Sequence, residues 1–151
     1  MVSKSRPRPP LPLIGVTAVL VSVLIAGCSG RRYDPTQATR PYPIDRPPTQ
    51  MLEIQALRSG GDLILVNASP FAFENVDIWV NQRYMLHLDR LDVGETRTTW
   101  FGNYFDQWGE TPVAGGFFRT EIPTPAVLVE FEIDREGPLF GAVAILDQGT
   151  Y

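Results

Sequence analysis

The 151-residue chain contains one cysteine, Cys28, and one histidine, His87. With a single thiol, no disulfide can form within the chain, and metal sites built on several thiolates are excluded. A single histidine likewise excludes sites that need a histidine pair. We therefore expect the folded part to be held together by burial of apolar side chains, without disulfides, metals or other cofactors.

Positive charge is also scarce after the N-terminal region. The only lysine is Lys4, and the chain has a formal net charge of −4. Within Met51–Tyr151, six arginines face fifteen acidic residues. A surplus of nine acids repels nucleic acid and anionic lipid headgroups, so the sequence argues against a nucleic-acid partner.

The N-terminus has the layout of an export signal. Met1–Pro10 carries three basic residues and no acid, and Leu11–Gly27 carries no charge. A basic start followed by an apolar stretch is typical of such signals. The alternative is a plain transmembrane anchor. The 17-residue stretch is at the lower limit for a hydrocarbon core of about 30 Å, and Pro12 shortens the helix further.

The residues that close the apolar stretch are Ile25-Ala26-Gly27-Cys28. They resemble the lipobox of bacterial lipoprotein precursors. The resemblance implies that the Cys28 thiol receives a diacylglycerol, that residues 1–27 are removed as a signal peptide, and that Cys28 anchors the protein in a membrane. Ser29 is similar to the pattern of Gram-negative lipoproteins sent to the outer membrane. The implied location is the bacterial cell envelope, with the protein on the outer membrane facing the periplasm.

A proline-rich segment separates the expected anchor from the remainder of the chain. Ser29–Gln50 contains five prolines, four arginines and few aliphatic residues. Such a composition does not bury enough apolar surface to offset the entropy of ordering. We therefore expect residues 28–50 to be a disordered tether, at about 3.1 Å per residue where extended, and residues 51–151 to be the folded domain.

The domain shows mostly the alternation of apolar and polar residues that is typical of strands. Strands are predicted at Leu52–Ala56, Leu63–Asn67, Val76–Val80, Tyr84–Leu88, Thr96–Phe101, Val127–Ile133 and Leu139–Leu146. In the sixth, Val129 and Phe131 are expected to face the core and Glu132 the solvent. Seven short strands without an amphipathic helix predict an all-β fold, most simply a small antiparallel immunoglobulin-like β-sandwich. A small β-barrel and a transthyretin-like sandwich are the alternatives.

Three segments strengthen the sandwich prediction. They are Leu65–Ser69, Val76–Asn81 and Leu91–Glu95. Together they resemble small bacterial Ig-like modules, in which a strand, an Asn-x-Ser loop, a second strand and a Leu-x-x-Gly-Glu turn follow one another. The resemblance implies the fold and no functional residue.

An aromatic segment, Trp100–Phe118, holds seven of the sixteen aromatic residues and is interrupted by four glycines and a proline. Exposed aromatic rings of this kind are typical of binding surfaces. The alternative is that the rings fold back and close one end of the sandwich. The candidate partner-binding residues are Trp108, Tyr104, Phe105, Trp100, Phe117 and Phe118, and Trp108 is expected to be more exposed than Trp100.

Candidate catalytic groups are few. His87 and Asp89 share one face of a strand, which is too little for a metal site. Asp106 and Glu110 are a candidate for the pair of carboxylates that glycoside hydrolysis requires, although acids in a domain with fifteen of them fall near one another by chance. We therefore favour a non-catalytic envelope lipoprotein that binds another protein or takes part in envelope assembly. A glycan- or small-ligand-binding module that uses residues 100–118 is the second hypothesis, and an enzyme based on Asp106 and Glu110 is the third.

Overall fold

The computed structural model describes residues 31–115 and 121–145. Two three-residue 3-10 helices, η2 (Pro35–Gln37) and η3 (Phe101–Asn103), accompany seven strands. The strands are β1 (Pro48–Ser59), β2 (Asp62–Asn67), β3 (Phe73–Val80), β4 (Tyr84–Leu91), β5 (Thr96–Trp100), β6 (Val129–Glu132) and β7 (Leu139–Ile145). Among these residues, no helix is long and apolar enough to cross a bilayer. The prediction of an all-β domain is confirmed.

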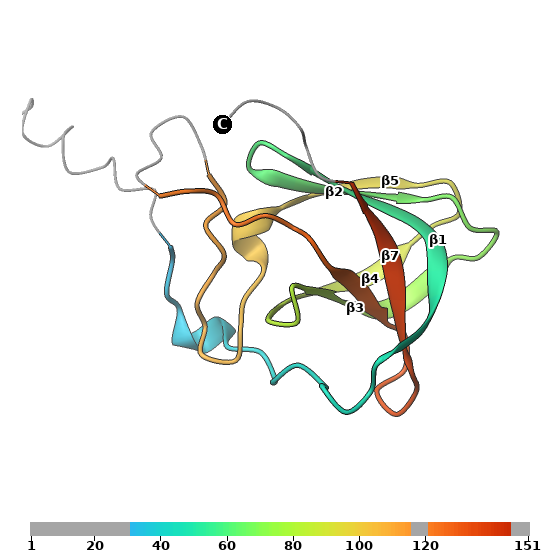
Figure 1. Cartoon of the computed structure of the whole chain (residues 1–151), viewed down its shortest axis with the longest axis horizontal. Helices are drawn as coiled ribbons and strands as arrows, with labels where there is room; N and C mark the ends of the chain where they lie inside the picture. The colour runs from blue at the N-terminus through green and yellow to red at the C-terminus, as the bar shows by residue number, and fades with distance from the viewer. Residues whose placement is uncertain (1–30, 116–120, 146–151) are drawn as a thin grey trace, which may run out of the picture.

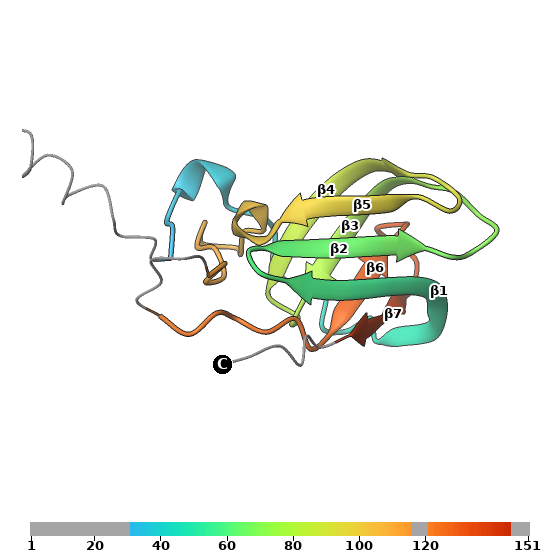
Figure 2. The same cartoon turned by 90° about the horizontal axis from the view of Figure 1, so that it is seen from above.

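The strands form one continuous sheet in the order β4-β3-β6-β7-β1-β2-β5. The sheet folds over on itself, so that β1, β2 and β5 lie over β3, β4 and β6 (Figures 1 and 2). The prediction of a purely antiparallel arrangement is wrong, because β1 and β7 pair in parallel, with Ala56 opposite Ala144. On its other edge, β1 pairs antiparallel with β2 over Ile54–Ser59, so the sheet is mixed.

The core lies between the two halves of the folded sheet. Alternate residues of β1 and β2 point inward, and so do alternate residues of β3 and β6. Fully or almost fully buried apolar side chains of this cluster include Ile54, Ala56, Leu63, Leu65, Val76, Ile78, Val129 and Phe131. The alternation in the sequence thus predicts the inward face of these strands correctly, and Val129 and Phe131 face the core as expected.

The outward face of β6 does not meet solvent as the alternation suggests. Glu132 is only 2% exposed and Glu130 is fully buried. The Glu132 carboxylate accepts hydrogen bonds from Arg40, Arg46 and the indole of Trp79. The prediction that Glu132 faces solvent is therefore wrong, because a segment distant in sequence covers this face.

That covering segment is residues 31–47, which we call the strap. Its Tyr42 ring packs edge-on against Trp79, with the ring centroids 5.4 Å apart. Arg40 binds both Asp77 and Glu132, and Arg46 binds Glu132 together with the backbone carbonyl of Gly137. The structure therefore differs from the expected disordered tether over residues 31–47, and the first strand begins at Pro48 rather than after residue 50. Charged hydrogen bonds from the strap to buried acids offset the entropy cost of ordering residues 31–47.

Two of the segments that resemble Ig-like modules meet at Asn67. The buried Asn67 amide donates to the carbonyl oxygens of Phe71 and Asp92, and its side-chain oxygen accepts from Ser69. The Asn67 carbonyl accepts from Gly94, whose φ of +71° suits glycine. Asn67 therefore ties the loop after β2 to the turn between β4 and β5.

Candidate functional site

The aromatic segment continues from η3 into a loop that is fixed at several points. Phe105 forms an isolated bridge with Met85 of β4. The Asp106 carboxylate then accepts from the backbone amides of Trp108 (3.0 Å) and Glu110 (2.8 Å). Gly109 has a φ of +85°, and a Cβ at this position would lie 2.2 Å from the Asp34 carbonyl oxygen. Only glycine therefore allows the strap and the loop to approach this closely.

Arg83, in the turn between β3 and β4, holds the same loop from the other side. Its guanidinium donates two hydrogen bonds to Asp106, at 2.9 and 2.7 Å, and one to Glu110 at 2.6 Å. Burial raises the pKa of Asp106, but the hydrogen bonds from Glu110, Arg83 and Trp108 outweigh it, and the pKa lies below its usual value. Asp106 is thus an ionised structural carboxylate that shapes the loop.

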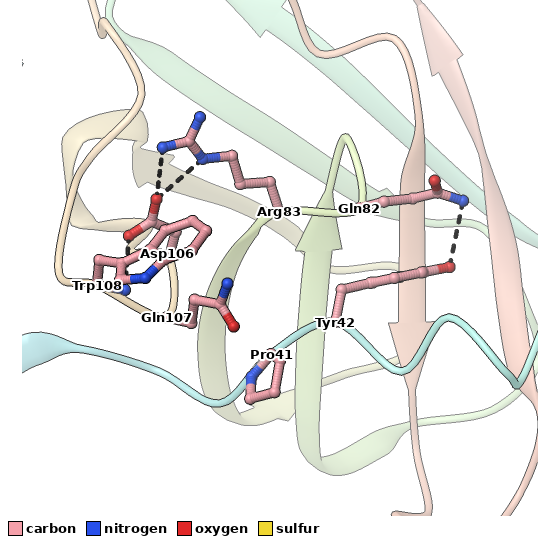
Figure 3. A pocket seen from close by; sticks show the side chains of 7 residues that line it. All are labelled: Pro41, Tyr42, Gln82, Arg83, Asp106, Gln107 and Trp108. Atoms are coloured by element: carbon pink, nitrogen blue, oxygen red, sulfur yellow. Dashed lines mark hydrogen bonds and ion pairs between the residues drawn. The ribbon is translucent and has the colours of Figure 1, made fainter.

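A surface depression of about 280 Å³ lies beside this ion pair (Figure 3). It is lined by Pro41, Tyr42, Gln82, Arg83, Asp106, Gln107 and Trp108. The strap, the β3–β4 turn and the aromatic loop each contribute to it, although they are far apart in sequence. We call it the Trp108 depression, after the residue that stands at its rim with 57% of its surface exposed.

The opposite wall of the Trp108 depression is polar and anchored. The Tyr42 hydroxyl donates to the buried Glu130 carboxylate at 3.1 Å and accepts from Gln82 at 3.4 Å. Burial and the neighbouring Glu130 raise the pKa of Tyr42 to about 12. Burial also raises the pKa of Glu130, and the Tyr42 hydrogen bond opposes that effect only in part. The depression therefore combines an indole with hydroxyl, amide and guanidinium groups held in fixed positions.

The predicted aromatic binding residues separate into three groups. Trp108 and Trp100 are exposed, at 57% and 47%, so the expected order of exposure is as observed. Tyr104 and Phe105 are buried, so their rings are not available to a partner, and for them the alternative, in which rings fold back into the domain, holds. Phe117 and Phe118 lie outside the described residues, as does Cys28.

Tyr104 is buried because its ring packs against Phe101 and its hydroxyl lies 2.9 Å from that of Thr99. Phe105 is buried beneath Arg32, whose guanidinium carbon lies 5.1 Å from the ring centroid. The same guanidinium reaches the Trp100 ring at 5.9 Å. Arg32 of the strap therefore covers the aromatic loop, while Trp100 keeps 47% of its surface exposed.

The candidate catalytic groups have structural partners. Asp106 and Glu110 share Arg83, and the lowered pKa of Asp106 is the reverse of what a general acid needs. His87 lies 2.7 Å from the buried Asp77 and 3.6 Å from Asp89. Over residues 31–115 and 121–145, no three histidine, cysteine, aspartate or glutamate residues come together as a metal site.

Sequence reasoning missed four residues that line the depression: Pro41, Tyr42, Gln82 and Arg83. For the strap, the sequence offered one indication, which is the aromatic side chain of Tyr42 within a segment that has few apolar residues. The other two follow Asn81, and both Asn81 and Gln82 have positive φ values, 54° and 56°. The predicted strands Val76–Val80 and Tyr84–Leu88 leave only a short connection at this place, but its proximity to Trp108 depends on contacts between distant segments.

Comparisons of the chain with protein-family models, curated proteins and solved structures found no match. The function therefore has to be inferred from the residues and their arrangement.

Proposed function

We propose that the chain is a lipid-anchored protein of the bacterial cell envelope whose β-domain binds another protein and has no catalytic role. Ile25-Ala26-Gly27-Cys28, after a basic and then an apolar stretch, supports the anchor. Ser29 supports the outer membrane as the destination. The anchor would be stable, because several acyl chains at about 0.8 kcal/mol per buried CH₂ hold a protein firmly without a transmembrane helix.

The observation that carries the binding role is Trp108. Its indole is more than half exposed although its backbone is fixed through Asp106 and Gly109. The Arg83 guanidinium lies 5.7 Å from the Trp108 ring centroid and supports the ring from one side. A rigid, exposed tryptophan beside a depression offers large contact area with little entropy left to lose, which is the character of an interface hot spot.

Affinity purification tests this role. The intact protein is purified from detergent-solubilised membranes, and the proteins that accompany it are identified by mass spectrometry. Trp108→Ala should reduce recovery of the partner at least about tenfold, because loss of a hot-spot tryptophan costs about 2 kcal/mol or more. Phe71→Ala is the matched control, since Phe71 is an exposed aromatic residue of the β2–β3 loop that does not line the depression. Equal recovery with both variants would contradict the proposal.

The second candidate function is recognition of a glycan. One observation favours it: the lining of the Trp108 depression includes an indole at one end and the side chains of Gln107, Tyr42 and Gln82 along it (Figure 3). An aromatic face at one end of a depression and hydrogen-bonding groups along its lining suit a sugar chain. Titration with envelope oligosaccharides should then change tryptophan emission in the wild type and not in Trp108→Phe. No change in the wild type would leave protein binding as the proposal.

For the fold, we propose the immunoglobulin-like sandwich as the finer description. One half of the sheet would be β1-β2-β5 and the other β4-β3-β6-β7, joined through the parallel β1–β7 pair. If β1 to β7 are lettered A, B, C, C′, E, F and G, the two halves correspond to the A-B-E and C′-C-F-G layers of Ig domains. Nuclear Overhauser contacts between Ala56 and Ala144, together with contacts between Ile78 and Phe131, would test the arrangement.

A further inference from the structure

The strap joins the β-domain immediately after the expected anchor. The Arg32 amide donates to the Thr111 hydroxyl at 2.9 Å, and the Thr111 amide donates to the Arg32 carbonyl at 2.9 Å. Tyr33 then pairs with Glu110 in an isolated bridge. A fully extended chain covers at most about 3.6 Å per residue, so Arg32 lies within about 14 Å of Cys28.

This short connection limits how far the domain can move from a bilayer. The acyl chains on Cys28 would enter the hydrocarbon core, and the headgroup region adds about 5–8 Å on each side of that core. A domain attached at Arg32 must then lie at the headgroups or within a few ångströms of them. Had residues 28–50 been a free tether, they would have reached roughly 60 Å from the membrane.

The end of the domain beside Arg31 carries exposed apolar side chains. Both views place the start of the described chain, the β1–β2 turn and the segment from residue 121 at this end (Figures 1 and 2). The Trp100 indole lies beside Gly61 in that turn, and Ile122 is 82% exposed. We call this region, defined by Arg31, Arg32, Trp100 and Ile122, the anchor-side end.

From this arrangement we infer that the anchor-side end lies on the bilayer, with Trp100 and Ile122 among the lipid headgroups. The inference rests on the proposed lipid anchor. Tryptophan and arginine are the side chains that favour the membrane–water interface. An aliphatic side chain as exposed as Ile122 gains by leaving water there. The loop that carries Trp108 pairs with the strap through Gly109 and Asp34, and both views draw η2, which follows Asp34, away from the β1–β2 turn (Figures 1 and 2). The Trp108 depression then lies outside the headgroups and open to a partner, although Arg31 reaches Glu110 of the same loop at 3.6 Å and keeps it near the bilayer.

The test uses tryptophan emission in the lipid-anchored protein. The protein is purified from membranes and reconstituted in phosphatidylcholine vesicles whose acyl chains are brominated or unmodified. Trp79 is fully buried and contributes a constant background. Trp108→Phe leaves Trp100 as the exposed reporter, and Trp100→Phe leaves Trp108, so each variant is the control for the other.

Brominated lipid should quench the Trp108→Phe protein clearly and the Trp100→Phe protein little. Ile122→Trp, which places a second reporter at the anchor-side end and leaves Trp100 in place, should increase the quenched fraction. Circular dichroism in unmodified vesicles confirms that each variant is folded.

Mass spectrometry of the same samples separates the two proposals. If Cys28 is acylated and the protein floats with vesicles, but Trp108 is quenched as much as Trp100 or more, the orientation is wrong and the anchor stands. If Cys28 carries a free thiol, the proposed anchor fails, and the inference drawn from it fails as well.

Discussion

Replacing Glu132 by glutamine tests whether the strap is an integral part of the domain. Glu132 is 2% exposed and is the common acceptor for Arg40, Arg46 and the Trp79 indole, the last at 2.9 Å. Glutamine keeps the shape but removes the charge that both guanidinium groups require. Breaking a buried ion pair typically costs about 3–5 kcal/mol.

Two features reduce the cost of breaking this ion pair. The Arg40 and Arg46 side chains remain 27% and 24% exposed, so water recovers part of their solvation. Arg40 also keeps its 2.7 Å contact with Asp77. We therefore expect Glu132→Gln to lower the free energy of unfolding by about 3 kcal/mol, near the lower end of that range. The melting temperature should fall by about 12–24 °C, since each kcal/mol shifts a domain of this size by about 4–8 °C.

Urea denaturation at pH 7 measures the change, with Glu53→Gln as the control. Glu53 is an exposed carboxylate on β1, and its replacement should stay within about 0.5 kcal/mol of the wild type. A Glu132→Gln protein as stable as the control would refute the structural role of the strap.

The pH dependence gives an independent check on the same residue. Burial raises the pKa of Glu132, but the hydrogen bonds from Arg46, Arg40 and Trp79 outweigh it and hold the pKa below the usual 4.5. A lowered acid pKa in the folded state stabilises the fold above the unfolded value, and this stabilisation is lost as pH falls through the folded value. The difference in unfolding free energy between wild type and Glu132→Gln should therefore be constant from pH 6 to 8, a range that begins about 1.5 units above the unfolded pKa. The difference should shrink as the medium becomes acidic.

Three further substitutions test the core, the loop connection and the binding surface. Phe131→Ala should lower the free energy of unfolding by about 3–5 kcal/mol, because the ring is fully buried, and urea denaturation would contradict this with a loss below about 1 kcal/mol. Asn67→Ala should cost about 2–4 kcal/mol in the same assay, because it removes four side-chain hydrogen bonds, to the carbonyls of Phe71 and Asp92 and from Ser69, each of about 0.5–1.5 kcal/mol; an unchanged midpoint would show that Asn67 does not tie the two loops. Trp108→Ala should keep the melting temperature within about 1–2 °C, and a larger fall would show that the ring supports the fold.

The strands were predictable because their signal is local. Alternation in β1, β2 and β3 identifies the inward residues, for example Ile54, Leu63 and Ile78, without knowledge of the partners. The parallel β1–β7 pair was not predictable, because the residues around Ala56 and Ala144 do not indicate which strands will be neighbours in the sheet.

The burial of β3 and β6 on both faces was not predicted, for a related reason. Alternation assigns one face of a strand to the core and assumes that the other meets water. Trp79 and Glu132 break that assumption because Arg40 and Tyr42 of the strap cover them. Considered alone, the Pro-rich composition of the strap predicts disorder. Its arginines hold it in place only because they bind buried acids on β3 and β6.

The candidate site was predictable in part. Trp108 could be singled out from its polar and glycine neighbours, and it stands exposed at a depression. Tyr104 belongs to the same aromatic segment but is buried, and its hydroxyl meets that of Thr99 inside the domain. Aromatic density therefore indicated a segment that contributes to the depression, whereas the orientation of each ring depends on the strap and the strand ends that pack around it.

The most direct test of the lipid-anchored proposal is the mass of the N-terminal peptide of the protein purified from membranes. Our account predicts a peptide that begins at Cys28 and carries a diacylglycerol on the thiol, with the Cys28→Ala variant retained as an uncleaved precursor or released as a soluble protein. A peptide that runs unbroken through Gly27-Cys28 with a free thiol in the wild type would contradict it.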